Sequence, residues 1–215
     1  MIENMKTIAG VDEAGRGCII GPLVVAGVSV SESNMERLRL TGVRDSKKLT
    51  AFRREILSKE VERLSDKIFY YELDPSAIDK VVYRGVRLRR LNYLEAIAMA
   101  KVIRELEPDV AYVDSSDVSP LRFSTQILRV LRRRPELICE HGADEKYPIV
   151  SAASILAKVR RDRIVAELRE RYGDFGSGYP SDNKTISFLV DWLKHRRGDS
   201  RFIRRSWRTL KKLGF

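Results

Sequence analysis

The sequence predicts an α/β fold in which a mixed five-stranded sheet is flanked by helices and followed by a C-terminal helical appendage. Three observations predict it. Apolar, β-branched runs open the chain, helix-like segments alternate with further strands in the middle, and further helix-like segments precede a short basic terminus. Strands that alternate with helices imply βαβ crossovers, and therefore a parallel portion of the sheet.

The first half of the chain supplies three strands and two helices. The strands are expected at 6–12, 22–30 and 67–74. Glycines separate the first two runs, which indicates neighbouring strands of one sheet. Two segments with apolar residues three and four apart lie between the second and third strands, at 34–40 and 50–65. Thr50 is a plausible N-cap for the second of these helices.

The second half alternates more regularly. After a turn or short helix at Pro75, the expected elements are a helix over 86–106, a strand over 108–115, a helix over 120–134, a strand over 136–144, a helix over 149–173 and a helix over 184–197. A loop, DFGSGYPSDN, separates the last two helices. Because composition shifts near Gly173, we expect a catalytic domain over 1–173 and a basic helical extension over 174–215.

Composition narrows the class of protein. The 215 residues can bury a large core, and the sequence shows neither an apolar stretch of membrane-spanning length nor a signal peptide. Cys18 and Cys139 are too few for a disulfide framework or a zinc site, and only two histidines accompany them. We therefore expect a cytoplasmic monomer with no membrane partner.

Positive charge is concentrated at the C-terminal end. The formal net charge is +11, of which residues 1–150 carry +2 and residues 151–215 carry +9. A localised excess of this kind favours a polyanionic partner such as nucleic acid, because each neutralised phosphate releases counterions. A solvated helical surface, or ion-pair networks for heat resistance, would account for the same charge.

Four carboxylates recur at the ends of predicted strands. Asp12 and Glu13 end the first strand, Asp114 ends the fourth, and Asp144 follows the fifth. Ligand sites in sheets with parallel strands lie at such ends. If these ends converge, cations are needed to hold like charges together. A lone aspartate would more simply be a capping residue.

The donor set suits Mg²⁺ or Mn²⁺ rather than a closed structural metal site. Mg²⁺ binds a few carboxylates together with waters and substrate phosphate oxygens, which favours phosphoryl transfer. Two such ions about 4 Å apart can activate a water and stabilise the leaving oxygen. Asp12 and Glu13 are adjacent, and successive side chains on a strand point to opposite faces. The two can therefore reach one site only if the chain turns or the longer Glu13 side chain wraps round.

A glycine-rich turn follows the acidic pair. Gly15 and Gly17 permit a turn and a close approach of backbone amides to substrate, and Arg16 adds charge. A tight hairpin would explain the glycines equally well. Neither the GxGxxG nor the GxxxxGK[ST] nucleotide motif is present, and neither histidine has the context of a catalytic triad.

Together these motifs resemble the ribonuclease HII family, in its compact, archaeal-like form. The matching stretches are GVDEAGRG with GPLVVAGV, DSKKL at 45–49, YVDS at 112–115, HGADEKYPIVSAASILAKVRRD at 141–162 and GSGYPSD at 176–182. The resemblance implies a ribonuclease H-like fold and hydrolysis of the RNA strand of RNA/DNA hybrids. It also implies incision 5′ of single ribonucleotides embedded in duplex DNA, which leaves 3′-hydroxyl and 5′-phosphate ends, as in ribonucleotide excision repair.

The resemblance also implies roles for individual residues. Asp12, Glu13, Asp114 and Asp144 would be the metal-binding catalytic acids. Gly15, Arg16 and Gly17 would read the ribose 2′-hydroxyl, which distinguishes RNA from DNA, and Tyr179 would stack on the neighbouring deoxyribose. Further candidate substrate contacts are Lys47, Lys48, Asn92, Lys146, Lys184, Arg204 and Arg205. For Lys47 and Lys48, an exposed helix start is an equally good interpretation.

Two other functions and one partner stay open at this stage. A nucleic-acid-binding module with structural acids, or a DNA nuclease or transposase on the same fold, would share many of these features. Some archaeal-type relatives end in a sliding-clamp-binding peptide with a glutamine and two aromatics. This chain ends WRTLKKLGF, which does not support clamp binding.

Overall fold

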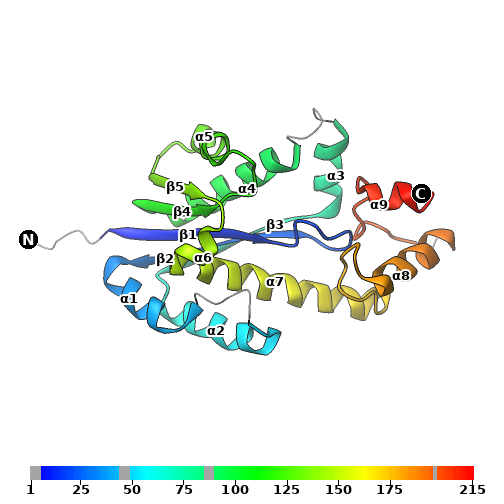
Figure 1. Cartoon of the computed structure of the whole chain (residues 1–215), viewed down its shortest axis with the longest axis horizontal. Coiled ribbons are helices and arrows are strands. Elements are labelled where there is room, and N and C mark those ends of the chain that lie inside the picture. The colour runs from blue at the N-terminus through cyan, green and yellow to red at the C-terminus, as the bar shows by residue number, and fades with distance from the viewer. Residues whose placement is uncertain (1–5, 44–48, 85–89, 196–197) are drawn as a thin grey trace, which may run out of the picture.

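The computed structural model describes residues 6–43, 49–84, 90–195 and 198–215. Its centre is a five-stranded sheet in the order β3-β2-β1-β4-β5 (Figure 1). The strands are β1 (Thr7–Ala14), β2 (Leu23–Ser31), β3 (Lys67–Leu73), β4 (Val110–Asp114) and β5 (Glu136–Glu140). The first three pair antiparallel, whereas β4 pairs parallel with β1 and β5 parallel with β4. The predicted mixed sheet is confirmed.

Helices cover both faces of the sheet (Figure 1). One face carries α4 (Arg90–Leu106) and α5 (Pro120–Val130), and the other carries α1 (Glu32–Leu40), α2 (Ala51–Leu64) and α7 (Pro148–Tyr172). The remaining helices are α3 (Pro75–Arg84), α6 (Ala143–Lys146), α8 (Asn183–Lys194) and α9 (Arg208–Lys212). Thr50 caps α2 as predicted, because its hydroxyl accepts the Arg53 amide. Among the described residues, no helix combines the length and apolarity needed to cross a bilayer.

The sequence expectations differ from the structure at a few boundaries. The predicted strand over 136–144 ends at Glu140, because Gly142 adopts a left-handed conformation (φ 63°) and α6 begins directly after it. Asp144 therefore lies on a helix rather than at a strand end. The short helix α9 was not predicted, and residues 86–89 of the expected helix lie outside the described residues.

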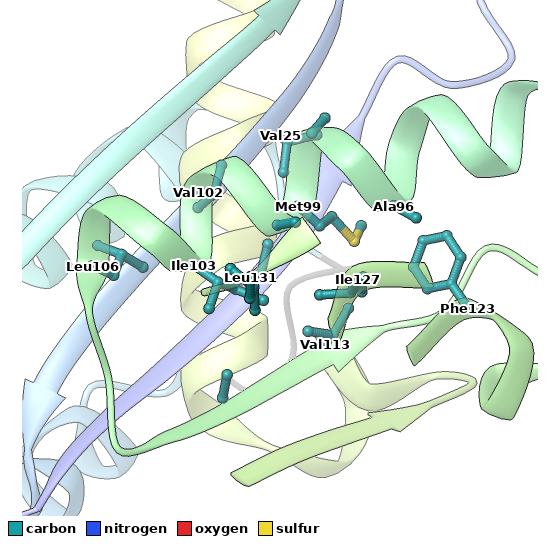
Figure 2. Packing of buried hydrophobic residues seen from close by; sticks show 14 of the residues in the cluster. Val25, Ala96, Met99, Val102, Ile103, Leu106, Val113, Phe123, Ile127 and Leu131 are labelled. Atoms are coloured by element: carbon teal, nitrogen blue, oxygen red, sulfur yellow. The ribbon is translucent and has the colours of Figure 1, made fainter. Parts of the chain in front are cut away.

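Alternation along β1 assigns its side chains to two cores. Ala9 and Val11 pack with α4 and α5, whereas Ile8 and Ala14 pack on the side of α7. Figure 2 shows the first core between α4, α5 and the sheet, with the labelled side chains Val25, Ala96, Met99, Val102, Ile103, Leu106, Val113, Phe123, Ile127 and Leu131. Asp12, an even-numbered residue of β1, therefore faces α7.

The start of helix α7 packs unusually close to the backbone of β1. A Cβ on Gly10 would lie 2.2 Å from the carbonyl oxygen of Ile149, at the start of α7. Glycine is thus needed at this position of β1 because the two backbones touch. Residues 149–157 of α7 are all buried, which explains why small residues such as Ala152 and Ala153 recur there.

Residues after Tyr172 fold back on the segment that follows β1. Ile20 forms an antiparallel bridge with Ile203, and both side chains are buried in a third apolar cluster. Phe175 and Leu189 belong to the same cluster. The C-terminal segment thus packs directly beside the predicted glycine-rich turn, although almost 190 residues separate them in sequence.

The contact at Gly10 leads to a stability prediction. Gly10→Ala should lower the free energy of unfolding by on the order of 3 kcal/mol, because the backbone of α7 must move to admit the methyl group. Gly17→Ala is the matched control, since a Cβ there would meet Tyr179 at an ordinary 3.8 Å. Urea unfolding of both variants measures the difference. Equal midpoints would show that the approach of α7 does not require glycine.

Candidate active site

Asp12 and Asp114 lie side by side where the parallel pairing of β1 with β4 ends. Val11 of β1 is in register with Val113 of β4, so the next residues on the two strands are Asp12 and Asp114. Both side chains point to the face that carries α7. Asp12 is 5% exposed, and Asp114 is half-buried.

Asp144 reaches this edge of the sheet from a helix. The amide of Ala143, the first residue of α6, donates to Asp114 Oδ1 at 2.7 Å. This bond attaches the start of α6 to the end of β4. Asp144, the next residue, is 3% exposed. The left-handed turn at Gly142 is therefore what returns the chain towards the strand ends.

Glu13 occupies the opposite face of β1. Its carboxylate lies within electrostatic reach of Asp12 and Asp114, and also of Glu95 on α4. Its Oε2 atom is buried and has no hydrogen-bond partner within the described residues. The longer glutamate side chain thus approaches the aspartates from the side of α4, while Asp12 approaches them from the side of α7.

Burial and mutual repulsion disfavour the charged forms of these acids. Burial, reinforced by the carboxylates of Asp114 and Asp144, raises the pKa of Asp12 to about 7. Hydrogen bonds from the Ser154 hydroxyl and the Glu13 amide partly offset this rise. Burial also raises the pKa of Glu13 well above its usual range, with Asp12 as the next largest cause. A nearby cation would relieve both penalties.

The chemistry of this donor set fits a hard divalent cation, although the side chains do not form a ready-made metal cage. Over the described ranges of the chain, no three histidine, cysteine, aspartate or glutamate side chains are grouped as metal ligands. The set nevertheless consists of carboxylate oxygens alone, which Mg²⁺ and Mn²⁺ prefer. The buried Oε2 of Glu13 is an acceptor that such an ion would satisfy.

The Gly-Arg-Gly turn directly follows this acidic edge. Gly15 has φ 84°, and a Cβ there would lie 2.6 Å from Arg161 Nε and 2.8 Å from a backbone oxygen. The Arg16 guanidinium is directed towards α4, where Nε donates to Glu95 Oε1 at 2.8 Å and Nη2 donates to Asn92 Oδ1 at 2.6 Å. Gly17 is exposed. Its backbone therefore remains accessible while the arginine side chain is held against the protein.

Tyr179 lies beside Gly17 on the loop between α7 and α8. The nearest ring atom is 3.8 Å from the position of a Cβ on Gly17. The Arg161 guanidinium packs under the ring, 4.8 Å from its centroid. Ile19 and Ile20 donate their amides to the Gly178 carbonyl, which ties the loop to the turn segment. The turn and the tyrosine thus form one continuous surface.

The other predicted substrate contacts lie in different settings. Lys47 and Lys48 fall outside the described residues. Asn92 is buried and bridges Arg16 and Asp117. Exposed Lys146 and Lys184 pair with Glu140 and Asp174.

The two C-terminal arginines differ in exposure. Arg205 is exposed, whereas Arg204 is 0% exposed and donates only to backbone carbonyls. The expectation that Arg204 contacts the substrate does not fit this burial. The sequence RRSWR does not indicate which of its first two arginines, Arg204 or Arg205, is buried.

Several residues at the site were not identified from the sequence. Glu95 accepts from both Arg16 and Ser116. Its position three residues after Asn92, on one helix face, is the signal that would have linked the two. Ser154 lies among the small residues in the first half of α7, yet it donates to Asp12. Arg161 supports both Gly15 and Tyr179 from α7, which no local pattern indicates.

The raised pKa of Asp12 predicts a pH-dependent stability. Because its pKa is about 7 in the folded chain against an ordinary value of 3.8, the stabilising contribution of the protonated acid is full below pH 3.8 and lost as pH rises through 7. In a chelating buffer, Asp12→Asn should therefore exceed the parent in stability by more at pH 8 than at pH 5. The gain in the free energy of unfolding should be larger at pH 8 than at pH 5 by on the order of 2 kcal/mol.

Urea unfolding at the two pH values measures this difference. Asp66→Asn, at an exposed carboxylate before β3, is the control and should show little change with pH. A gain for Asp12→Asn that is the same at pH 5 and pH 8 would mean that Asp12 is already ionised at pH 5 in the folded chain.

Comparisons with known proteins agree with this arrangement. A family model described as Ribonuclease HII matches residues 9–210. Ribonuclease HII of Methanosarcina barkeri is 42% identical over 215 residues, covering 96% of this chain and 94% of the relative. The crystal structure of ribonuclease H2 from Pyrococcus horikoshii OT3 superposes with a TM-score of 0.87 at 43% identity and covers 96% of both chains.

A second solved structure is the PCNA:RNase HII complex from Archaeoglobus fulgidus, with a TM-score of 0.83, 43% identity, and coverage of 93% of this chain and 94% of that one. Family model, relatives and fold all agree. The chain belongs to the ribonuclease HII family and is a ribonuclease H, a hydrolase that cleaves the RNA strand of RNA/DNA hybrids.

Proposed function

We propose that this chain incises duplex DNA on the 5′ side of a single embedded ribonucleotide, as well as cutting RNA/DNA hybrids, and leaves 3′-hydroxyl and 5′-phosphate ends. Two Mg²⁺ or Mn²⁺ ions would be held by Asp12, Glu13, Asp114 and Asp144. The observation that carries the proposal is the side-by-side placement of Asp12 and Asp114 on neighbouring strand ends, next to the Gly-Arg-Gly turn.

The acidic residues would hold the divalent cations, and neighbouring side chains would hold the acidic residues in position. Bound divalent cations supply an activated water and charge stabilisation at a phosphodiester. Asp12 and Asp114 would hold them from the sheet, and the Ser154 hydroxyl donates to the Asp12 carboxylate. Glu13 adds an oxygen from the side of α4. Arg16 offsets part of the charge on Glu13 and is itself anchored by Glu95.

The turn and Tyr179 would select the ribose. A 2′-hydroxyl is both a donor and an acceptor, so a backbone with free polar groups can distinguish it from deoxyribose. The Gly17 amide is such a group, and this residue has no side chain in the way. Tyr179, whose ring is packed on Arg161, offers a rigid face for the adjacent sugar. The turn directly follows Asp12 and Glu13 along the chain, so a sugar bound there would lie near the acids.

Basic side chains would hold the duplex around this centre. Residues 151–215 carry most of the net positive charge, and Lys184 and Arg205 are exposed there. Lys146 is exposed beside the acidic edge. Lys47 and Lys48 remain candidate phosphate contacts. In this proposal residues 1–173 carry the catalysis and residues 174–215 add the basic extension.

A sliding clamp is a separate candidate partner. The Archaeoglobus fulgidus relative was solved in complex with PCNA. In this chain the C-terminal Phe215 is exposed and would offer one aromatic side chain for such a contact. Co-elution of the chain with a clamp, with and without Phe215→Ala, tests the contact directly.

A cleavage assay tests the proposed activity. A duplex with one embedded ribonucleotide should be cut once, 5′ of that nucleotide, when Mg²⁺ or Mn²⁺ is present, and should stay intact in chelator. Asp12→Asn should lower the rate by about a thousandfold or more while the protein stays folded, since a ligand to the ions is lost. Binding without scission would favour a binding module, and scission of an all-DNA duplex would favour a DNA nuclease.

The space beside Gly17 gives a second test. Gly17→Ala should fold normally but cut the embedded ribonucleotide at least about tenfold more slowly, because the methyl group would stand 3.8 Å from the Tyr179 ring on the proposed sugar-binding surface. Steady-state cleavage, together with circular dichroism of the same preparation, measures both properties. A rate equal to that of the parent would show that the sugar does not approach this part of the turn.

A further inference from the structure

Consecutive carbonyl groups of the Gly-Arg-Gly turn accept hydrogen bonds from the C-terminal segment. Arg204 Nη2 donates to Gly15 O at 2.7 Å, and Nη1 donates to Arg16 O at 2.8 Å. Trp207 Nε1 donates to Gly17 O at 3.3 Å. The third arginine donor, Nε, bonds Gly21 O at 3.0 Å, just beyond the turn. Two side chains thus hold every carbonyl of the motif.

Arg204 and Trp207 act as one rigid unit. The guanidinium is fully buried and lies 4.9 Å from the centroid of the Trp207 ring. Burying a guanidinium is unfavourable unless its donors are bonded in good geometry. The three carbonyl contacts satisfy that requirement, so the guanidinium has little freedom to shift. Backbone bonds from Arg204 to Ile19 and from Gly21 to Phe202 hold the segment in place.

The planar peptide bond transmits this restraint to the other side of the turn. In a trans peptide the N–H points opposite to the C=O of the same unit. When Arg204 holds the carbonyls of Gly15 and Arg16, the amides of Arg16 and Gly17 must therefore point away from the C-terminal segment. Within the described part of the chain these two amides donate to no acceptor. They are available to a ligand.

We propose that Arg204 and Trp207 are positioning residues that set the peptide planes of the Gly-Arg-Gly turn, and thereby set how strongly the enzyme prefers ribose to deoxyribose. This inference rests on the proposed role of the turn as the reader of the 2′-hydroxyl. It explains why a fully buried arginine lies within the basic C-terminal run, where an exposed phosphate contact was expected.

The two tryptophans of the chain supply a matched experiment. Trp207→Phe keeps an aromatic ring over Arg204 but removes the donor to Gly17 O. Trp192→Phe removes an indole N–H that is buried without a hydrogen-bond partner in the described residues, in the adjoining aromatic cluster. Both variants lose the same atoms. Only Trp207→Phe loses a bond to the turn.

The measurements are cleavage of a duplex with one embedded ribonucleotide, with kcat and KM separated, and affinity for the same duplex made entirely of DNA. Trp207→Phe should lower kcat/KM on the ribonucleotide substrate about fivefold, the size expected for one lost hydrogen bond. Affinity for the all-DNA duplex and the melting temperature should change little. Trp192→Phe should match the parent in cleavage and in DNA affinity.

Arg204→Lys gives a stronger second variant, because a lysine keeps the charge but cannot reach several carbonyls at once. It should lower ribonucleotide cleavage by more than Trp207→Phe while DNA affinity stays near that of the parent. If this variant proves unstable, the tryptophan pair still decides the question.

The possible outcomes separate the inference from the proposed function. If the parent does not distinguish the ribonucleotide duplex from the all-DNA duplex, the proposed function fails. If the parent does distinguish them and Trp207→Phe distinguishes them equally well, only the positioning role fails. An equal loss in Trp192→Phe and Trp207→Phe would also overturn it, since the effect would then come from packing alone.

Discussion

Several carboxylates are buried together where a parallel strand pair ends, and this burial, reinforced by their mutual repulsion, is the constraint on which the site depends. Because Val11 of β1 is in register with Val113 of β4, Asp12 and Asp114 lie next to each other. Ser154 from α7 lowers the penalty for charging Asp12, and Arg16 from the following turn lowers it for Glu13. The part of the penalty that is not offset favours the binding of a positive charge at this site.

The same close packing orders the elements around the acids. Gly10 allows the backbone of α7 to touch β1, which brings Ser154 and Arg161 into reach of the strand end. The left-handed Gly142 turns the chain after β5 so that α6 attaches to Asp114. Gly10 and Gly142 therefore set the positions of side chains several residues away from them.

The Gly-Arg-Gly turn is held by its own arginine and by two arginines from distant parts of the chain. Arg16 anchors it to Glu95 on α4, Arg161 of α7 fills the space under Gly15, and Arg204 holds its carbonyls. Such a turn is rigid although it is rich in glycine. A rigid backbone can use small differences in hydrogen bonding, such as the presence of one hydroxyl, to distinguish substrates.

The sequence by itself determined the strands and most helices and predicted the four candidate acids, because period-two alternation and charged residues after apolar runs are local patterns. It also linked these motifs, in their order, to the ribonuclease HII family. Only the tertiary structure decided that Asp144 lies on a helix, that Glu95 and Ser154 contact the site, and that Arg204 faces inward while Arg205 faces outward. These features depend on contacts between residues far apart in the chain, and no local pattern encodes which of two neighbouring arginines is buried.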